Sequence, residues 1–245
     1  EVFDAVSNGA IELGHGAAYY WAGKIPAAQF FATVPFGMNA QQMNAWLIGA
    51  GGHELWKETY DLLYDKEEHL YARDIKYKLD EPGIEPRTEA NGEKIFWSRG
   101  NGWVMGGLVR TLKELPQDWP TRDFYIQNYK EMAAKIASLQ QDDGLWRASL
   151  LDPESYPGGE ASGSGFYTYA LAWGINNGIL DKEKYLPVVE KAWIGMNSLI
   201  QPDGRVGWVQ PIGADPRKNF SAKSWEVYGT GAFLLAGSEV IKLDE

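Results

Sequence analysis

Tryptophan and carboxylate side chains are the residue types whose abundance in this chain most suggests chemistry. The 245 residues include 11 Trp, 13 Tyr and 9 Phe, with 33 acidic and 23 basic side chains, for a formal net charge of −10. The C–H face of a pyranose stacks on an indole ring, while carboxylates bind hydroxyl groups and transfer protons. This composition favours a sugar-binding protein. A globular protein with a tryptophan-rich core is the alternative that composition leaves open.

Several other kinds of site have little support in the sequence. The chain has no cysteine, and its three histidines, His15, His53 and His69, are not spaced as a pair of metal ligands. We therefore expect no metal ion. No phosphate-binding glycine loop occurs, and we expect no cofactor. An acidic chain is a poor partner for nucleic acid or for an anionic membrane, and no apolar run is long enough to cross a bilayer.

Three glycine signatures at nearly equal intervals indicate the elements that position the chemistry. Their Gly-x-Gly cores begin at positions 100, 163 and 229, which are 63 and 66 residues apart. Apolar residues at helical spacing follow each signature and also occur between signatures. The repeated unit is therefore a helical hairpin of about 60 residues. We expect helices at 40–63, 100–115, 122–140, 162–177, 184–200 and 226–243.

Paired helices joined by long loops fit an α/α toroid, in which loops at one end of the ring line a cleft. Glycines at the helix starts would let a neighbouring backbone or a ligand approach closely. The expected helices make about three hairpins, whereas a closed ring of six hairpins needs twelve helices. We therefore predict a mainly α fold, a partial α/α toroid, whose open helical flanks favour self-association.

Residues 1–56 differ in composition from the rest of the chain. Charged residues make up 23% of the whole sequence, yet only five occur in this segment: Glu1, Asp4, Glu12, Lys24 and Glu54. The local pattern indicates a small mixed α/β segment. We predict two regions, 1–56 and 57–245.

Five sequence strings carry a resemblance to a known enzyme family. They are Tyr60-Asp-Leu-Leu-Tyr-Asp-Lys-Glu-Glu-His69, Phe96-Trp-Ser-Arg-Gly-Asn-Gly-Trp103, Asp143-Gly-Leu-Trp-Arg147, Tyr156-Pro-Gly-Gly-Glu-Ala-Ser-Gly-Ser-Gly165 and Ser224-Trp-Glu-Val-Tyr-Gly-Thr-Gly231. From about residue 54 to the end, the chain resembles the C-terminal half of glycoside hydrolase family 105, the unsaturated rhamnogalacturonyl hydrolases, which are related to family 88. The resemblance implies part of an (α/α)₆ barrel. It also implies release of an unsaturated uronic acid from pectin-derived oligosaccharides by hydration of a C4=C5 double bond.

The resemblance implies substrate-binding roles for five residues. Arg99 would bind the uronate carboxylate, because a guanidinium holds a carboxylate through two hydrogen bonds. Trp103, four residues further on, would share that helix face and stack on the sugar. His69 would bind the substrate or the attacking water, and Trp97 and Trp146 would form cleft walls. The structural alternatives are a histidine that stabilises a turn and an arginine that stacks on tryptophan.

The catalytic residue is not identified by this resemblance. In the family the proton is donated by an aspartate in the N-terminal half, in a stretch that residues 1–56 do not match. Asp4 is the only aspartate of that segment, and its surroundings do not fit. The enzyme assignment is therefore open, although the resemblance favours it.

Residues 1–56 instead resemble a fragment of the periplasmic solute-binding proteins of tripartite ATP-independent transporters. The matching strings are Val2-Phe-Asp-Ala-Val6, Leu13-Gly-His-Gly-Ala-Ala-Tyr-Tyr-Trp21, Lys24-Ile-Pro-Ala-Ala28, Val34-Pro-Phe-Gly37 and Met43-Asn-Ala-Trp-Leu47. The two resemblances meet near residue 56, which suggests a chimeric chain. The resemblance to family 105 implies a location in the cytoplasm or periplasm, and the resemblance to the solute-binding proteins implies the periplasm.

The sequence leaves three hypotheses about the function of this chain. The first is hydrolysis of an unsaturated uronyl oligosaccharide, with full or impaired activity. The second is binding of a carbohydrate or an organic acid without catalysis. The third is an inactive chimeric or designed helical protein.

Overall fold

The computed structural model describes residues 62–78, 87–213 and 215–244. By internal contacts the chain divides into two compact units, Glu1–Leu63 with Ile212–Ala214, and Tyr64–Pro211 with Asp215–Glu245. Nearly all of the described residues belong to the second unit. The mixed α/β segment expected at 1–56, and all but the last two residues of the helix expected at 40–63, lie outside the described residues.

Five α-helices dominate the part of the second unit that the structure describes. They are α4 (Ser98–Glu114), α5 (Arg122–Ser138), α6 (Ala161–Asn176), α7 (Lys182–Asn197) and α8 (Val227–Val240). Short 3-10 turns are η3 (Ile75–Tyr77), η4 (Pro153–Ser155) and η5 (Ile241–Asp244). Two short antiparallel strands, β1 (Tyr64–Asp65) and β2 (Leu70–Tyr71), pair Tyr64 with Tyr71 and Asp65 with Leu70.

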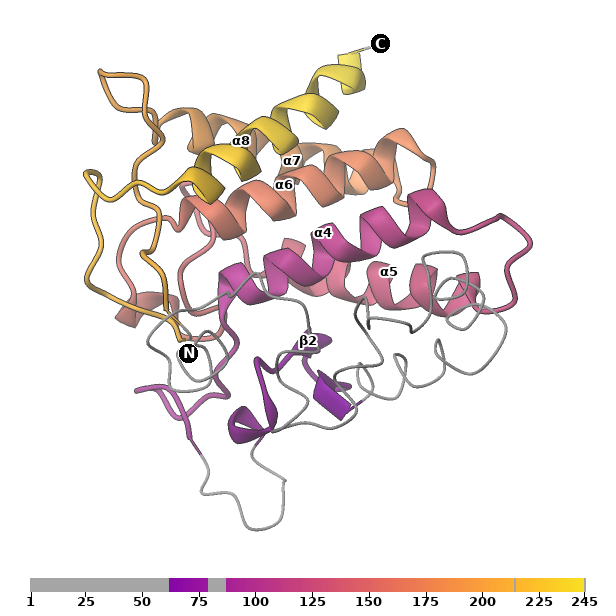
Figure 1. Ribbon diagram of the computed structural model, residues 1–245, viewed down its shortest axis with the longest axis horizontal. Helices are drawn as coiled ribbons and strands as arrows, with labels where there is room; N and C mark the ends of the chain where they lie inside the picture. The colour runs from indigo at the N-terminus through magenta and orange to yellow at the C-terminus, as the bar shows by residue number, and fades with distance from the viewer. Residues whose placement is uncertain (1–61, 79–86, 214, 245) are drawn as a thin grey trace, which may run out of the picture. The chain divides into compact units, whose positions relative to one another are not determined.

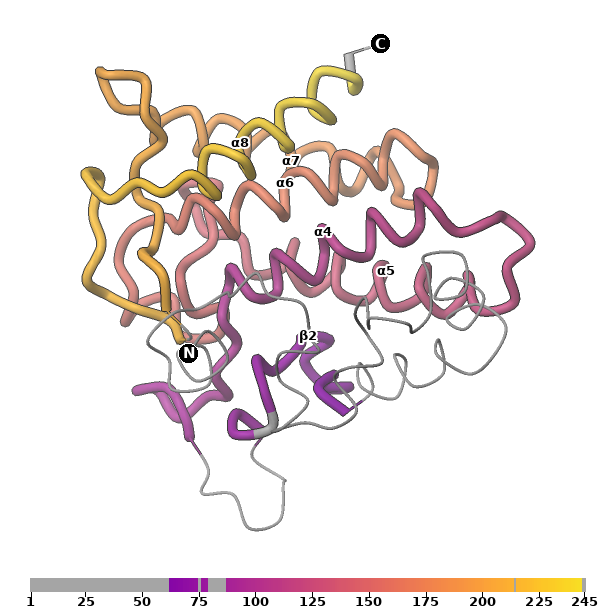
Figure 2. The backbone as a smooth tube through the Cα atoms, in the orientation of Figure 1, coloured from indigo at the N-terminus to yellow at the C-terminus, as the bar shows by residue number. Residues whose placement is uncertain are grey.

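The helices form two layers. Helix α6 packs between α4 and α8, and these three run side by side in the same direction (Figure 1). Helices α5 and α7 pack outside α4 and α6 and return the chain, so that α4/α5 and α6/α7 are hairpins. The long connections that precede α6 and α8 gather at the end where α4, α6 and α8 begin (Figure 2).

The residue types of α6 account for its central place. Fifteen of its sixteen residues are buried, and its sequence is apolar or small on every face. A helix that is apolar all round must be covered on all sides. By contrast, α5 and α7 carry charged residues on their outer faces and bury a single side, as expected for an outer layer.

Close backbone approach explains the glycine signatures. A Cβ atom added to Gly102 of α4 would lie 3.1 Å from the Cβ of Phe166 and 3.3 Å from the Cα of Gly163. A Cβ on Gly165 would lie only 2.8 Å from the Cβ of Ala232 on α8. The expectation that these glycines permit close approach is therefore confirmed at both neighbours of α6.

The five helices expected between 100 and 243 are confirmed, with boundary shifts of a few residues. Helix α7 begins at Lys182 because the Asp181 side chain accepts hydrogen bonds from the N–H groups of Glu183 and Lys184. The last part of the helix expected at 226–243 is the 3-10 turn η5. Among the described helices, none has the length and apolar character that a membrane crossing requires.

Candidate functional site

The string Phe96–Trp103 joins a short extended segment to the first turn of α4. Its extended part is fixed by Ala148–Leu150, since the N–H of Ser98 donates to the carbonyl of Ala148 (2.9 Å) and the N–H of Leu150 donates to that of Phe96 (3.0 Å). Trp97 is the residue that precedes the helix, and Arg99 is in its first turn. The start of α4, which carries both residues, lies at the end where the long loops gather (Figure 1).

Arg99 is buried, with 2% of its surface exposed. Its Nη1 donates to the carbonyl of Gln210 (2.5 Å), and its Nη2 donates to that of Pro211 (3.2 Å). The guanidinium carbon lies 4.6 Å from the ring centre of Trp97 and 4.7 Å from that of Tyr228. The predicted pair Trp97 and Arg99 is therefore in contact, and it is held by a loop and a tyrosine that the sequence motifs did not assign to it.

Trp97 is also buried, and its indole N–H donates to Oε1 of Gln210 at 3.4 Å. Gln210 is fully buried, and its carbonyl accepts a further hydrogen bond from the hydroxyl of Tyr228 (2.8 Å). Tyr228 belongs to the third glycine signature, so its place near the site could have been inferred from the repeat. Nothing in the local sequence marks Gln210.

Trp103 occupies a different environment from Arg99, although the two are one helical turn apart. It is 48% exposed, and its ring packs on Phe166 with centroids 4.4 Å apart. It lines a cleft of about 390 Å³ over α6, between α4 and α8, together with Gly106, Gly107, Arg110, Lys113, Glu114, Phe166, Tyr169 and Leu235. An exposed indole beside basic side chains retains the surface that sugar stacking needs.

His69 lies in the turn between β1 and β2 with φ of 53°, in the left-handed region. Its Nδ1 is 2.9 Å from the hydroxyl of Tyr64 and 3.4 Å from Oε2 of Glu131 on α5. The Tyr64 hydroxyl donates to the same Oε2 (2.7 Å). Burial raises the pKa of Glu131, but hydrogen bonds from Tyr64 and Gln127 and the nearby His69 bring that pKa below its ordinary value. In this structure His69 joins the turn to α5.

Trp146 is part of the core. It has no exposed surface, its indole N–H donates to the carbonyl of Ile136 (2.8 Å), and it packs edge-on against Tyr167 at 5.2 Å. An indole that is covered on every side offers no face to a sugar. For Trp146 the structure thus agrees with the alternative interpretation of the composition, a tryptophan-rich core.

Asp215 lies among cationic side chains just after the Gln210–Pro211 segment. Its Oδ2 is 3.7 Å from Nη2 of Arg87, and within the described residues its buried Oδ1 accepts no hydrogen bond. Burial raises the pKa of Asp215, and this effect outweighs the lowering by Arg73 and Arg217. A raised pKa means that this carboxyl keeps its proton to a higher pH than an exposed aspartate does.

The comparison that decides the family covers most of the chain. The profile of the family described as Glycosyl Hydrolase Family 88 matches residues 35–244. This chain belongs to glycosyl hydrolase family 88. The resemblance to the unsaturated uronyl hydrolases is thereby confirmed at the level of the family, and the match begins inside the segment 1–56.

Two relatives set the degree of similarity of this family 88 chain. It is 57% identical over 220 residues to an unsaturated 3S-rhamnoglycuronyl hydrolase of Formosa agariphila, covering 89% of this chain and 57% of that protein. A glycosyl hydrolase family 88 structure from Bacteroides vulgatus has a TM-score of 0.72 and 34% identity, covering 92% of this chain and 59% of that chain. The family 88 chain spans little more than half the length of these relatives. The predicted fold class, a mainly helical partial α/α toroid, is confirmed.

A third relative matches a short stretch. The family 88 chain is 54% identical over 60 residues to a monocarboxylate 2-oxoacid-binding periplasmic protein of Nostoc, covering 24% of this chain and 16% of that protein.

Among the described residues, no group of three or more histidine and carboxylate side chains is arranged to hold a metal ion.

Proposed function

We propose that this family 88 chain takes part in release of an unsaturated uronic acid from rhamnose-containing oligosaccharides, by hydration of the C4=C5 double bond. The observation that carries the proposal is the 57% identity to the Formosa agariphila unsaturated 3S-rhamnoglycuronyl hydrolase over 89% of this chain. That identity favours a rhamnoglycuronyl substrate over the pectin-derived rhamnogalacturonan that the sequence strings first suggested.

The reaction needs a proton at C4, a water at C5 and a counter-ion for the uronate carboxylate. We assign the counter-ion to Arg99 and sugar stacking to Trp103. Arg99 is 2% exposed because the Gln210–Pro211 carbonyls and two aromatic rings enclose it. Direct binding of a carboxylate to Arg99 therefore requires Nη2 to exchange its 3.2 Å hydrogen bond to the Pro211 carbonyl for the substrate, while the Gln210 carbonyl keeps Nη1 in place.

Among the described residues, the best candidate for the proton donor is Asp215. Protonated Asp215 would add its proton to C4, water would add to the resulting cation at C5, and the water's proton would return to the carboxylate. The hemiketal formed then opens and releases the aglycone. Support comes from the raised pKa of Asp215 and from its place beside the loop that contacts Arg99. The pKa values of Glu131 and Glu239 lie below the ordinary value, which suits them less to this role.

The test uses the ultraviolet absorbance of the C4=C5 bond in an unsaturated uronyl–rhamnose disaccharide. We expect the wild type to remove this absorbance, and we expect Arg99→Ala and Asp215→Asn to do so at least tenfold more slowly. Arg205→Ala is the matched control, because Arg205 pairs with Asp203 on an exposed turn. Equal background rates for wild type and Arg99→Ala would show that the chain is not this enzyme.

The second candidate function is binding without catalysis. It is favoured by the cleft at Trp103, which offers an exposed indole and the cations Arg110 and Lys113. Calorimetric titration with the same disaccharide separates the two functions, since a binding protein takes up the sugar and leaves its double bond intact. Trp103→Ala should weaken this binding.

The division of the chain into 1–56 and 57–245 is also a proposal, as is a chimeric origin. The 60-residue match to the Nostoc protein supports a solute-binding-like first segment.

We also propose self-association through the flank of α8. It is supported by Val227, Leu234 and Ile241, which are 76%, 65% and 69% exposed. Light scattering after gel filtration tests it, because Leu234→Glu should shift a dimer to a monomer. A monomeric mass for the wild type would refute it.

A further inference from the structure

We infer that Gln210 is a positioning residue for the proposed reaction, which holds Trp97, Arg99 and the Asp215–Arg217 segment in one arrangement. The inference rests on the proposed function, because it concerns the groups assigned to the uronate and to the proton. Gln210 belongs to neither a glycine signature nor a family string. It is fully buried and bonds to residues from four separate parts of the chain.

The main chain of Gln210 joins α6 to α4 and α8. Its N–H donates to Oε1 of Glu160 (3.1 Å), the buried residue that caps the first turn of α6. The carbonyl of Gln210 accepts from Nη1 of Arg99 (2.5 Å) and from the hydroxyl of Tyr228 on α8 (2.8 Å). The starts of all three inner helices are thus connected through one peptide unit.

The side chain of Gln210 joins Trp97 to the part of the loop that follows, at Asp215 and Arg217. Its Oε1 accepts from the indole N–H of Trp97 (3.4 Å) and from the N–H of Arg217 (3.3 Å). Its Nε2 donates to the carbonyl of Asp215 (2.9 Å). The amide orientation is defined, because reversing it would direct an N–H₂ group at two N–H donors and an oxygen at a carbonyl.

No other residue type meets these requirements at a fully buried position. Glutamate keeps the acceptor but has no N–H to offer the Asp215 carbonyl, and leucine has neither group. Asparagine is one methylene shorter and cannot reach both sides together. Arg99 bonds to the main-chain carbonyl of Gln210, which is still present when the Gln210 side chain is replaced. The replacement instead releases the loop that carries this carbonyl. We therefore expect Arg99 and its neighbours to be displaced, although none of them is lost.

Affinity and catalysis test the inference with three variants of the full chain. Gln210→Leu should raise the KM for the unsaturated uronyl–rhamnose disaccharide and lower kcat/KM by about 100-fold at a temperature at which the protein stays folded. Gln210→Glu, which keeps the Trp97 and Arg217 contacts, should lie between Gln210→Leu and the wild type. The control is Tyr129→Phe, which removes a buried hydrogen bond to the carbonyl of Ala170 and should leave both kinetic constants unchanged.

A readout that does not depend on turnover separates this inference from the proposed function. The indole N–H resonance of Trp97, assigned by Trp97→Phe, should shift and exchange faster in Gln210→Leu, and should be unchanged in Tyr129→Phe. If the wild type neither binds nor hydrolyses the disaccharide, the proposed function fails, while the indole resonance still decides whether Gln210 positions Trp97. A Trp97 resonance and kinetic constants equal to wild type in Gln210→Leu would overturn the inference.

Discussion

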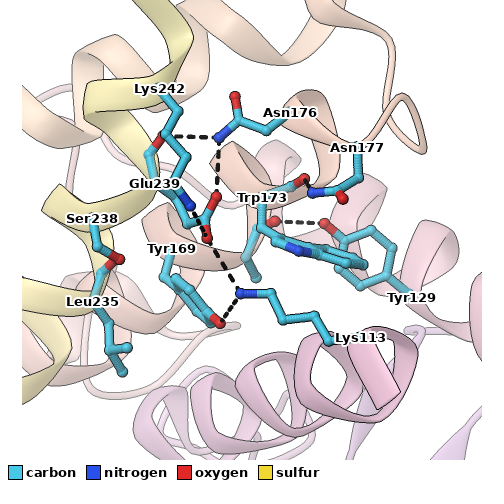
Figure 3. Close-up of polar contacts among 11 residues, drawn as sticks. Lys113, Tyr129, Tyr169, Trp173, Asn176, Asn177, Leu235, Ser238, Glu239 and Lys242 are labelled. Atoms are coloured by element: carbon cyan, nitrogen blue, oxygen red, sulfur yellow. Dashed lines mark hydrogen bonds and ion pairs between the residues drawn. The ribbon is translucent and has the colours of Figure 1, made fainter. Parts of the chain in front are cut away.

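Helices α4, α6 and α8 carry a buried polar network at each end, and the two networks use different partners. At their first turns, Arg99 bonds to the carbonyls of Gln210 and Pro211 and stacks on aromatic rings. At their last turns, the buried carboxylate of Glu239 accepts from Lys113 (3.3 Å), Asn176 (3.0 Å) and Lys242 (2.9 Å), as Figure 3 shows.

The different bonding partners of Arg99 and Glu239 indicate different roles for the two networks. Carbonyl partners join a helix to the loop that contains Gln210 and Pro211. Carboxylate and ammonium partners from α4 and α8, with an amide from α6, tie helices to one another. We therefore expect changes at the first network to alter ligand binding, and changes at Glu239 or Asn176 in the second network to alter stability alone.

The largest expected effect is at the first network. Arg99→Met removes two charged hydrogen bonds and leaves the carbonyls of Gln210 and Pro211 without this donor, which should destabilise the protein by about 3 kcal/mol and also abolish binding of the uronyl disaccharide. Urea unfolding and calorimetric titration measure the two effects. Asn176→Leu is the comparison variant at the second network, because Asn176 bonds to Glu239 and does not line the cleft at Trp103. The comparison is wrong if Asn176→Leu weakens binding as much as Arg99→Met does.

A smaller effect is expected for Glu239→Ala. This change removes the common acceptor of Lys113, Asn176 and Lys242, but both lysines are partly exposed and can regain water. We expect a loss of about 2 kcal/mol in the free energy of unfolding. Disaccharide affinity at a temperature at which both proteins are folded should be unchanged. A fall in affinity would mean that the two networks are coupled along the helices.

The pH dependence of stability should sharpen the same contrast. Burial raises the pKa of Glu239, but hydrogen bonds from Lys242, Asn176 and Lys113 outweigh it and place the pKa below the ordinary value of 4.5. A lowered folded-state pKa gives stability that is present above pH 4.5 and is lost as the pH falls through the folded-state pKa. The stability difference between wild type and Glu239→Gln should therefore shrink below pH 4.5. Urea midpoints at pH 7, 5 and successively lower values measure it, and a constant difference would contradict it.

The smallest effect is expected for Tyr129→Phe in the core between α5 and α6. The Tyr129 hydroxyl donates to the carbonyl of Ala170 at 2.5 Å, and this bond is separate from the bond between Lys113 and Glu239 (Figure 3). Loss of one neutral hydrogen bond should cost about 1 kcal/mol and leave binding unchanged. Thermal unfolding gives the first quantity and titration the second. A larger loss than that of Glu239→Ala would reverse the ranking.

The helices could be predicted from sequence because their information is local. Apolar spacing, Asp-Gly turns and the glycine signatures lie within each element, and Gly102, Gly163 and Gly165 do make the close contacts that their type suggested. The family could also be recognised, because its strings surround these glycines.

The site was predicted less completely, because side-chain direction depends on distant parts of the chain. Trp97 and Arg99 were identified from their string, yet their partner Gln210 is more than a hundred residues away. Trp146 gave no local sign that it would be fully buried. For His69, a single turn residue does not reveal that its ring meets Glu131 on α5.

The glycine contacts of α6 also bear on how this protein can change over evolutionary time. Gly163 lies against α4 and Gly165 against α8, so substitutions at either position are excluded by contact with a neighbouring helix rather than by the reaction. The exposed residues of the connecting loops are under no such restriction, whereas buried loop residues such as Gln210 and Gly144 are held by close contacts of their own. Descendants can therefore exchange exposed loop residues, and with them sugar preference, while the helical scaffold is inherited nearly unaltered.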